Sequence, residues 1–369
     1  MIPMMEKTRN RYNPSVVPHP GLTLEDFLED RAMSQKELSD RTGLSTKAIN
    51  ELIKGKTLMR RDTAELLEPI FGLPASFWLD KVNRYQEYLS VIKKSEVSEE
   101  QASFINLFPI KEAIKKELFP VVDLKNNQEV HSAFLNFFNV SGVEQWKTMW
   151  CGSDLCFRKS EVFEQNFFAT SLWIRAAEIE AVEISCNPVD LEGLRELLPR
   201  FRKMTVMTEL DKIKNELRSL LSSVGVAFVV LPELKGCVAS GVTKWFKNKV
   251  MLLLSNRHKT NDSFWFSFFH EIGHILLHGK KEVFVDIISS EEREMSEQER
   301  EADSFALNTL IDKKSWSKYI NSQGYRKQEA ITAFANELGI AKGIIAGRLQ
   351  KEFNLWHMQY LHKLKIQYK

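Results

Sequence analysis

Two histidines and a glutamate interrupt the apolar stretch FWFSFFHEIGHILLHG, residues 264–279. His270 and His274 are four residues apart, so on a helix both side chains project from one face and can converge on one ion. Glu271 can then reach a water molecule on the metal without being a ligand. In this HExxH arrangement zinc acidifies the water and the glutamate takes its proton. Because burying His-Glu-His without partners is costly, we predict one zinc ion per chain rather than a merely structural helix.

His278 lies in the same apolar run, but helix geometry excludes it from the ligand set. Eight residues of helix separate it from His270 by about 12 Å at 1.5 Å per residue. The ligands of one zinc ion lie much closer together than that. We expect His278 at the helix end, or as a hydrogen-bonding partner of the site.

A catalytic zinc needs a third protein ligand and keeps its fourth position open. The downstream segment EREADSFALNTLI predicts a helix on which Glu299 and Asp303 share one face, four residues apart. Glu299 can supply the third ligand, while Asp303 can accept the other ring N–H of a liganding histidine. Glu301 competes for the ligand role, although by helical period it projects in another direction.

The elements that position these groups begin after Gly225. VAFVVL, CVASGVTKWF and KVMLLLS are rich in β-branched and aromatic residues and predict three short strands. The HExxH helix follows, with Asn261, Asp262 or Ser263 as its N-cap and Gly279 as its stop. An acidic loop, EEREMSEQER, is expected next. AITAFANELGIAKGIIAGRLQKEF predicts two more helices around a glycine turn.

The middle of the chain, residues 90–220, shows helical periodicity without a ligand cluster, a phosphate loop or a repeat. PIKEAIKKELF, SLWIRAAEIEAVEI and ELDKIKNELRSLL each place apolar residues three and four apart. We interpret this region as a helical spacer or docking domain. Residues 1–20 contain four prolines and little apolar periodicity, which predicts an extended arm.

The front of the chain carries a second functional pattern, MSQKELSDRTGLSTKAINELIKG. Ser34 and Glu37 form a capping box, Gly43 lies in a turn and Ser45 caps the next helix, as in a helix-turn-helix unit. The second helix of such a unit enters the major groove of DNA. Ala48, Ile49 and Leu52 are expected in the core. The residues expected to contact DNA are Gln35, Ser45, Thr46, Lys47, Asn50 and Lys54.

Local charge supports this prediction, because residues 31–61 hold eight basic residues against three acidic ones. A local net charge of +5 suits contact with DNA phosphates, whereas the whole chain carries only +2. The alternative is a small helical domain used only for dimerisation or protein contact.

Composition bounds the remaining possibilities. The 369 residues are 43% hydrophobic and 27% charged, which is typical of a soluble protein with two or three domains. The N-terminus has no apolar core of signal-peptide length, and the longest apolar run is too short for a bilayer, so we expect a cytoplasmic protein without membrane contact. The four cysteines form no CxxC pair, which leaves a zinc ribbon unsupported and favours reduced buried thiols.

The segment FWFSFFHEIGHILLHGKKEVFVD, with EREADSFALNTLI, resembles the ImmA/IrrE family of zinc metallopeptidases, and the likeness covers residues 224–353. It implies a zincin-like fold with His270, His274 and Glu299 as ligands, Glu271 as general base and Asp303 at the family's Asn/Asp position. It also implies a gluzincin-type endopeptidase that cleaves a repressor or antitoxin in a stress or phage response. One departure is visible: family members often end this helix with Met-Pro or Ile-Pro, whereas this chain has Ile311-Asp312.

Residues 19–88 resemble HigA-type antitoxins of the Xre helix-turn-helix class. That resemblance implies a helical scaffold, binding to double-stranded operator DNA as a homodimer, and neutralisation of a toxin partner. We therefore predict a mainly α protein with a small β-sheet (α+β). Its expected parts are an arm at 1–20, a five-helix DNA-binding domain at 21–89, a helical region at 90–220 and a metallopeptidase domain at 221–369.

The sequence thus favours a DNA-binding regulator fused to a zinc endopeptidase that cuts a cognate repressor, an antitoxin or its own N-terminal domain. The main alternative is a non-catalytic antitoxin or repressor whose zinc is structural or sensory. A structural zinc usually has four protein ligands, often including cysteine, and would leave Glu271 without a role. A third possibility is an antitoxin that binds a toxin through the middle region.

Overall fold

A computed structural model gives the fold of most of the chain. It is mostly helical with one small three-stranded sheet, as predicted. Two compact units, residues 1–98 and 99–369, are described separately below. None of the described helices is long and apolar enough to cross a membrane. The described residues are 17–95, 97–155, 161–237, 239–256, 260–279 and 297–368.

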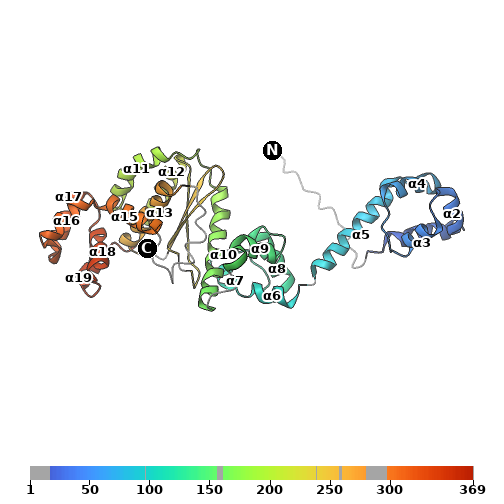
Figure 1. Ribbon diagram of the computed structural model, residues 1–369, viewed down its shortest axis with the longest axis horizontal. Coiled ribbons are helices and arrows are strands. Elements are labelled where there is room, and N and C mark those ends of the chain that lie inside the picture. Colours follow the sequence, from blue (N-terminus) through green and yellow to red (C-terminus); the bar gives the residue numbers. More distant parts are fainter. Residues whose placement is uncertain are drawn as a thin grey trace, which may run out of the picture. The chain divides into compact units, whose positions relative to one another are not determined.

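The first unit is a bundle of five helices, which confirms the expected number (Figure 1). Leu24, Leu38, Ile49 and Trp78 come from four of these helices and are fully buried together in its core. Most of the arm predicted at residues 1–20 lies outside the described residues. The helices are α1 (Pro20–Asp30), α2 (Gln35–Thr42), α3 (Thr46–Ile53), α4 (Arg61–Phe71) and α5 (Ala75–Ser95).

In the second unit, the first five helices carry an aromatic core. Phe108, Phe134 and Trp146 are buried against one another, with ring centroids 4.8 to 6.4 Å apart. The last of these helices, α10, also packs on β1 and β3. These helices are α6 (Glu99–Ile105), α7 (Ile110–Lys115), α8 (Asn127–Phe138), α9 (Val143–Leu155) and α10 (Glu161–Glu183).

The three predicted strands are confirmed as β1 (Val226–Leu231), β2 (Gly241–Trp245) and β3 (Val250–Ser255). Their order is β1-β3-β2, with β1 parallel and β2 antiparallel to the central β3. Every residue of β3 is buried, as its continuous apolar sequence requires in a strand covered on both faces. Among the described residues, β2 therefore forms one edge of the sheet.

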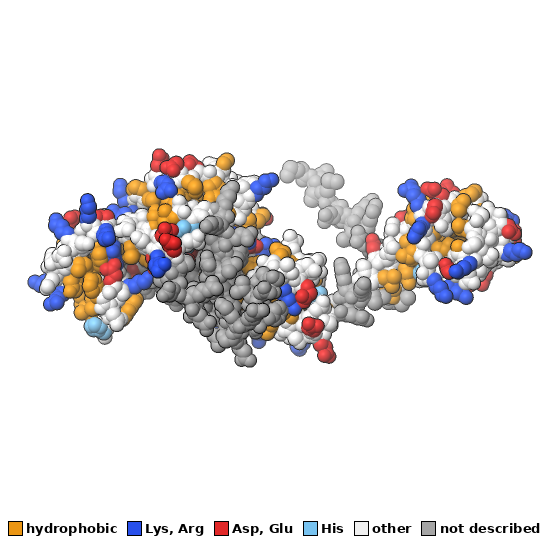
Figure 2. Space-filling view, in the orientation of Figure 1, with side chains coloured by type: hydrophobic (Ala, Val, Ile, Leu, Met, Phe, Trp, Pro, Cys, Tyr) orange, Lys and Arg blue, Asp and Glu red, His pale blue; other side chains and the backbone are white. Residues whose placement is uncertain are grey.

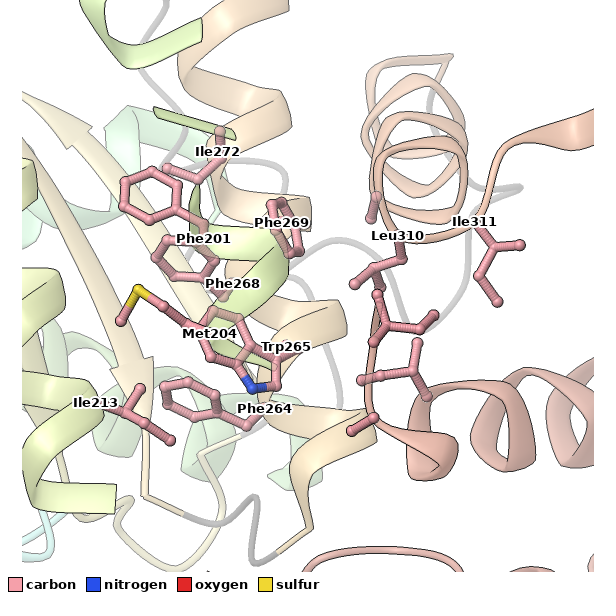
Figure 3. Close-up of a cluster of buried hydrophobic side chains, with 14 of the residues drawn as sticks. Phe201, Met204, Ile213, Phe264, Trp265, Phe268, Phe269, Ile272, Leu310 and Ile311 are labelled. Atoms are coloured by element: carbon pink, nitrogen blue, oxygen red, sulfur yellow. The ribbon is translucent and has the colours of Figure 1, made fainter. Parts of the chain in front are cut away.

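Each face of the sheet has its own hydrophobic core. Val229 and Leu253 face the aromatic core of α6–α10, whereas Phe228 and Leu252 face the helices that follow and precede the sheet. On that second face Phe201, Met204, Ile213, Trp265 and Phe268 converge (Figure 3). They come from α11 (Leu191–Met204), α12 (Leu210–Ser223) and α13 (Asn261–Leu277).

The domain boundary expected at residue 220 falls inside α12. Leu217 and Leu221 on either side of it are fully buried in the same core as the sheet. The amphipathic pattern of α12 is therefore explained by packing on β1, with which it makes extensive contact. Helices α11 and α12 thus help to hold α13 in place rather than forming part of a separate spacer.

The helix α13 begins one residue earlier than expected. Its N-cap is Thr260, so the prediction of Asn261, Asp262 or Ser263 is wrong. The Asn261 side chain does not cap the helix, because its Oδ1 accepts a hydrogen bond of 3.0 Å from the backbone N–H of Ile366. The helix ends at Leu277, just before Gly279, whose φ of +64° suits glycine. Most of the acidic loop EEREMSEQER lies outside the described residues.

The C-terminal helices complete the fold, and α15 and α18 pack on α13. The glycine turn expected between two late helices is confirmed, because Gly339 caps α17 in the left-handed conformation. Cys186 and Cys237 are free thiols; Cys237 is buried, as expected, whereas Cys186 is half-buried. The elements are α15 (Glu297–Leu310), α16 (Lys313–Asn321), η2 (Gly324–Arg326), α17 (Gln328–Leu338), α18 (Lys342–Phe353) and α19 (Gln359–Lys363).

Candidate functional site

Helix α13 presents its two histidines toward α15. The Nε2 atoms of His270 and His274 lie 3.0 Å apart, as expected for residues one helical turn apart on the same face. The side chain of His274 is 7% exposed and that of His270 is 16% exposed, so the surrounding protein fixes both rings. The apolar residues next to them in the sequence, such as Phe268, Phe269 and Ile272, are fully buried and anchor α13 in the core.

Glu299 of α15 reaches both histidines. Its Oε2 lies 3.2 Å from Nε2 of His270, and its Oε1 lies 3.3 Å from Nε2 of His274. One ligand atom from each of the three residues falls within 4.8 Å of the others. Two imidazole nitrogens and one carboxylate oxygen form a donor set that suits zinc and leaves a coordination position open.

A second set of hydrogen bonds lies behind these groups. Nδ1 of His270 is 2.9 Å from Oδ1 of Asp303, the distance of a hydrogen bond that orients the ring. Nδ1 of His278 is 3.0 Å from Nδ1 of His274, and its Nε2 is 2.9 Å from Oε2 of Glu301. The structure therefore brings Glu299 to the histidine pair, whereas Glu301 contacts only His278 in this group.

Charges in the cluster are strongly coupled. Burial by itself would lower the pKa of His270, but hydrogen bonds to Asp303 and Glu299 and the charge of Glu271 raise that pKa to about 10. Hydrogen bonds from His270 and His274 hold the pKa of Glu299 far below its usual range. A proton on His270 competes with a metal for the ring, so metal binding at this cluster releases that proton.

Glu271 is not part of this set, although it lines the same cavity, and its carboxylate contacts the sheet. The Thr243 hydroxyl on β2 donates a hydrogen bond of 2.7 Å to Oε2 of Glu271. Gly241 lies on the other side of the carboxylate, where a Cβ would sit 2.6 Å from Oε1. Burial raises the pKa of Glu271, although the nearby histidines and the Thr243 hydroxyl oppose the rise. A carboxylate with a raised pKa suits general acid–base work near neutral pH.

A cavity of about 600 Å³ opens beside these residues. Its walls come from β2, α13, α15, α18 and the segments next to them, and include large apolar side chains such as Phe266, Ile344 and Trp356. Lys351 of α18 lines it as well, with its Nζ 3.8 Å from Oδ2 of Asp303 and 4.5 Å from the centroid of the Phe266 ring. The candidate metal ligands thus face a space large enough for part of a polypeptide.

Thr243, Gly241 and Lys351 were not predicted as site residues from the sequence. Only Gly241 left a signal, because an isolated glycine in a strand often marks a close approach of another group. Nothing in the spacing of Thr243 or Lys351 relates either residue to the HExxH helix. They are 28 and 80 residues from Glu271, and packing alone brings them to the site.

The helix-turn-helix residues form a second candidate site in the first unit. Ser34 caps α2 by accepting the N–H of Glu37 at 3.1 Å, and Ser45 caps α3 by accepting the N–H of Ala48 at 3.1 Å. The Glu37 carboxylate pairs with Arg41 at 2.6 Å instead of completing the capping box. Gly43 makes the turn with a φ of +76°.

The expected DNA-contacting residues surround the start and exposed side of α3. Thr46, Lys47 and Lys54 are exposed, and Asn50 is half-buried. The Lys47 side chain is 86% exposed, and its Nζ is 4.0 Å from Glu51, so its charge is available to a phosphate. On the opposite side Ile49 and Leu52 are buried, as predicted, whereas Ala48 is only half-buried. Among the remaining expected contacts, Ser45 is exposed and Gln35 is half-buried.

Both candidate sites lie in segments that match known family models. Residues 23–67 match the Cro/C1-type HTH DNA-binding domain, and residues 238–350 match the Peptidase M78 family, described as an IrrE N-terminal-like domain. The chain carries both domains. The second match begins just before β2 and includes the HExxH helix, Glu299 and most of α18. No curated protein matches the chain.

Proposed function

We propose that this protein is a DNA-binding regulator whose second unit is a zinc-dependent endopeptidase. Its substrate is a cognate repressor or antitoxin protein, or its own front end, in a stress, phage-defence or toxin–antitoxin setting. The observation that carries this proposal is that the side chains of α13 form two separate groups. His270 and His274 converge with Glu299, while Glu271 is excluded from that set and held separately by Thr243. A purely structural metal site gives no reason for that arrangement.

The residues of the site suit peptide hydrolysis. Zinc held by His270, His274 and Glu299 would act as a Lewis acid that acidifies water and polarises the scissile carbonyl. Glu271 would take the proton of the attacking water and deliver it to the leaving amine. Its burial favours the protonated form, and the Thr243 hydroxyl keeps one oxygen in place during both steps. Asp303 would hold the His270 ring in one orientation.

The edge of the sheet supports a polypeptide substrate. Ser255 N–H donates to the Ser240 carbonyl and Phe246 N–H donates to the Lys249 carbonyl, which fixes the alternation of the antiparallel ladder. The backbone groups of Gly241 and Thr243 consequently point away from β3. No strand among the described residues pairs with that side of β2. An extended peptide could add there beside Glu271.

The first unit would direct the protein to operator DNA. We propose that α3 enters the major groove as a recognition helix, with Ser45, Thr46, Lys47 and Asn50 toward the bases or phosphates. Lys54 at its C-terminus and Gln35 at the start of α2 would contact the backbone. A homodimer, as in Xre-class regulators, would read two half-sites.

One experiment tests the peptidase proposal directly. Wild type, Glu271→Gln and the control Glu301→Gln are purified, their zinc content is measured, and each is incubated with the protein products of neighbouring genes. We expect near-stoichiometric zinc in all three, and cleavage by wild type and Glu301→Gln alone. Absence of zinc from wild type refutes the site, and undiminished cleavage by Glu271→Gln refutes the role of the base.

For the first unit, salt-dependent binding to the protein's own promoter should be lost in Lys47→Ala/Asn50→Ala.

A further inference from the structure

Charge is distributed very unevenly along the second unit. Residues 312–369 contain eleven Lys and Arg against four Asp and Glu, a net charge of +7. Residues 99–311 contain 25 against 31, a net charge of −6. Arg348 and Lys351 line the candidate cavity, but the candidate metal cluster and its base lie on α13 and α15, so the proposed hydrolysis leaves most of this excess charge unexplained. Figure 2 shows Lys and Arg side chains around exposed hydrophobic ones over the region of α16–α19.

Two large aromatic side chains are exposed in this basic region. Phe353 is 41% exposed and Trp356 is 53% exposed, although rings of this size are usually buried. Asn354 between them has a φ of +53° and ends α18, while Leu355 turns inward against the core. Both rings are therefore exposed on either side of this turn, and their Cα atoms are at most about 11 Å apart at 3.8 Å per residue.

Both rings are held in place by neighbouring groups. Tyr325 stacks on Phe353 with ring centroids 5.7 Å apart and an angle of 5° between the planes. The Tyr360 hydroxyl donates a hydrogen bond of 3.2 Å to the Tyr325 carbonyl, which ties η2 to α19. At Trp356, Nζ of Lys365 lies 5.6 Å from the ring centroid, and Nε2 of His362 lies 2.9 Å from the backbone carbonyl oxygen. Exposed rings held in this way form a platform that loses little side-chain entropy when a ligand binds.

Cations flank the platform. The guanidinium of Arg326 lies 6.0 Å from the Tyr325 ring centroid, and Lys327 follows it in the chain. Lys363 is one turn beyond Tyr360 on the same face of α19, and all three cationic residues are exposed. The nearest acidic residue in sequence, Glu352, is engaged by Arg348 at 2.7 Å and by the Trp316 indole N–H at 2.7 Å.

We propose that Tyr325, Phe353 and Trp356, flanked by Arg326, Lys327 and Lys363, form a binding surface for single-stranded nucleic acid. Bases stack on exposed aromatic rings without sequence preference, while Lys and Arg contact the phosphates between them. An acidic polypeptide would satisfy the cations but would not supply successive planar groups to the rings. This surface is separate from the helix-turn-helix, which is suited to the major groove of a duplex.

The test uses the full chain and fluorescein-labelled dT20, with U20 as the ribonucleotide counterpart, in fluorescence anisotropy titrations. We expect dissociation constants in the micromolar range at 50 mM salt. Neutralising three phosphates should give a slope of log K against log salt near −2, from about −0.7 per phosphate. Phe353→Ala/Trp356→Ala should weaken binding about tenfold or more, because each stacked base contributes about 1–3 kcal/mol. Trp356→Phe should retain most of it.

Three controls make the result decisive. Arg326→Glu/Lys363→Glu should abolish binding, whereas Lys111→Ala/Lys115→Ala on α7 removes two positive charges elsewhere and should have little effect. Lys47→Ala/Asn50→Ala should leave the dT20 affinity unchanged. The proposal is overturned if dT20 and U20 fail to bind, if the ring substitutions have no effect, or if the helix-turn-helix variant loses binding. It is also overturned if polyglutamate of equal charge competes as well as dT20, because the occupant would then be an acidic polypeptide.

Discussion

Replacement of Asp303 by alanine provides a quantitative test of how the candidate metal centre is built. Oδ1 of Asp303 lies 2.9 Å from Nδ1 of His270, and the carboxylate is 24% exposed. Carboxylates that orient a liganding histidine are worth about 10- to 100-fold in metal affinity. Without Asp303 the ring can rotate, so His270 must be reordered each time a metal binds.

A second effect acts in the opposite direction. The pKa of His270 is about 10, and Asp303 is one of the groups that raise it. At pH 7.5 the proton must leave before the ring can bind a metal, which costs about 3 kcal/mol at 1.36 kcal/mol per pH unit. Asp303→Ala reduces that cost and so offsets part of the lost orientation. We expect a net loss of zinc affinity of about tenfold at pH 7.5, and a larger loss at pH 9.5, where little proton competition remains.

Competition with a fluorescent chelator measures the affinity, and calorimetry in buffers of different ionisation enthalpy counts the protons released. Glu301→Ala is the matched control, because Glu301 contacts His278 at the same 2.9 Å distance but is not in the ligand cluster. It should change zinc affinity by less than about threefold. Equal losses in the two variants, or no loss in Asp303→Ala, would refute the assignment of Asp303 as the residue that orients His270.

Three further outcomes are expected. Gly241→Ala should retain zinc but lower cleavage at least tenfold, because its Cβ would lie 2.6 Å from Oε1 of Glu271; metal analysis and a cleavage assay check this together. In EDTA, the urea midpoint should fall as pH rises from 6.5 to 10, because a histidine whose pKa is raised on folding stabilises the fold below 6.5 and loses that effect by about 10. His270→Asn should abolish this slope. Ile49→Ala, at a fully buried position, should destabilise the first unit by about 2–5 kcal/mol and leave zinc affinity unchanged, as two-stage thermal unfolding would show.

Sequence alone located the elements with strong local periodicity. The three strands, the HExxH helix and the helix-turn-helix were all identified, because alternation, i,i+4 spacing and capping residues are local properties of the chain. The start of α13 was predicted one residue too late. Thr260 caps α13 because the Asn261 side chain is engaged by the backbone of Ile366, a partner 105 residues away. No local pattern carries that information.

The division between local and tertiary information is clearest at the candidate site. Helical spacing by itself determined that His270 and His274 share a face, that His278 is too far along the axis to join them, and that Glu299 and Asp303 project together. Only the packing of α15 on α13 brought Glu299, rather than Glu301, within 3.3 Å of the histidine pair. Packing against β2 then placed Thr243 and Gly241 around Glu271. Periodicity fixes directions within one element, whereas distances between elements depend on buried side chains that are far apart in sequence.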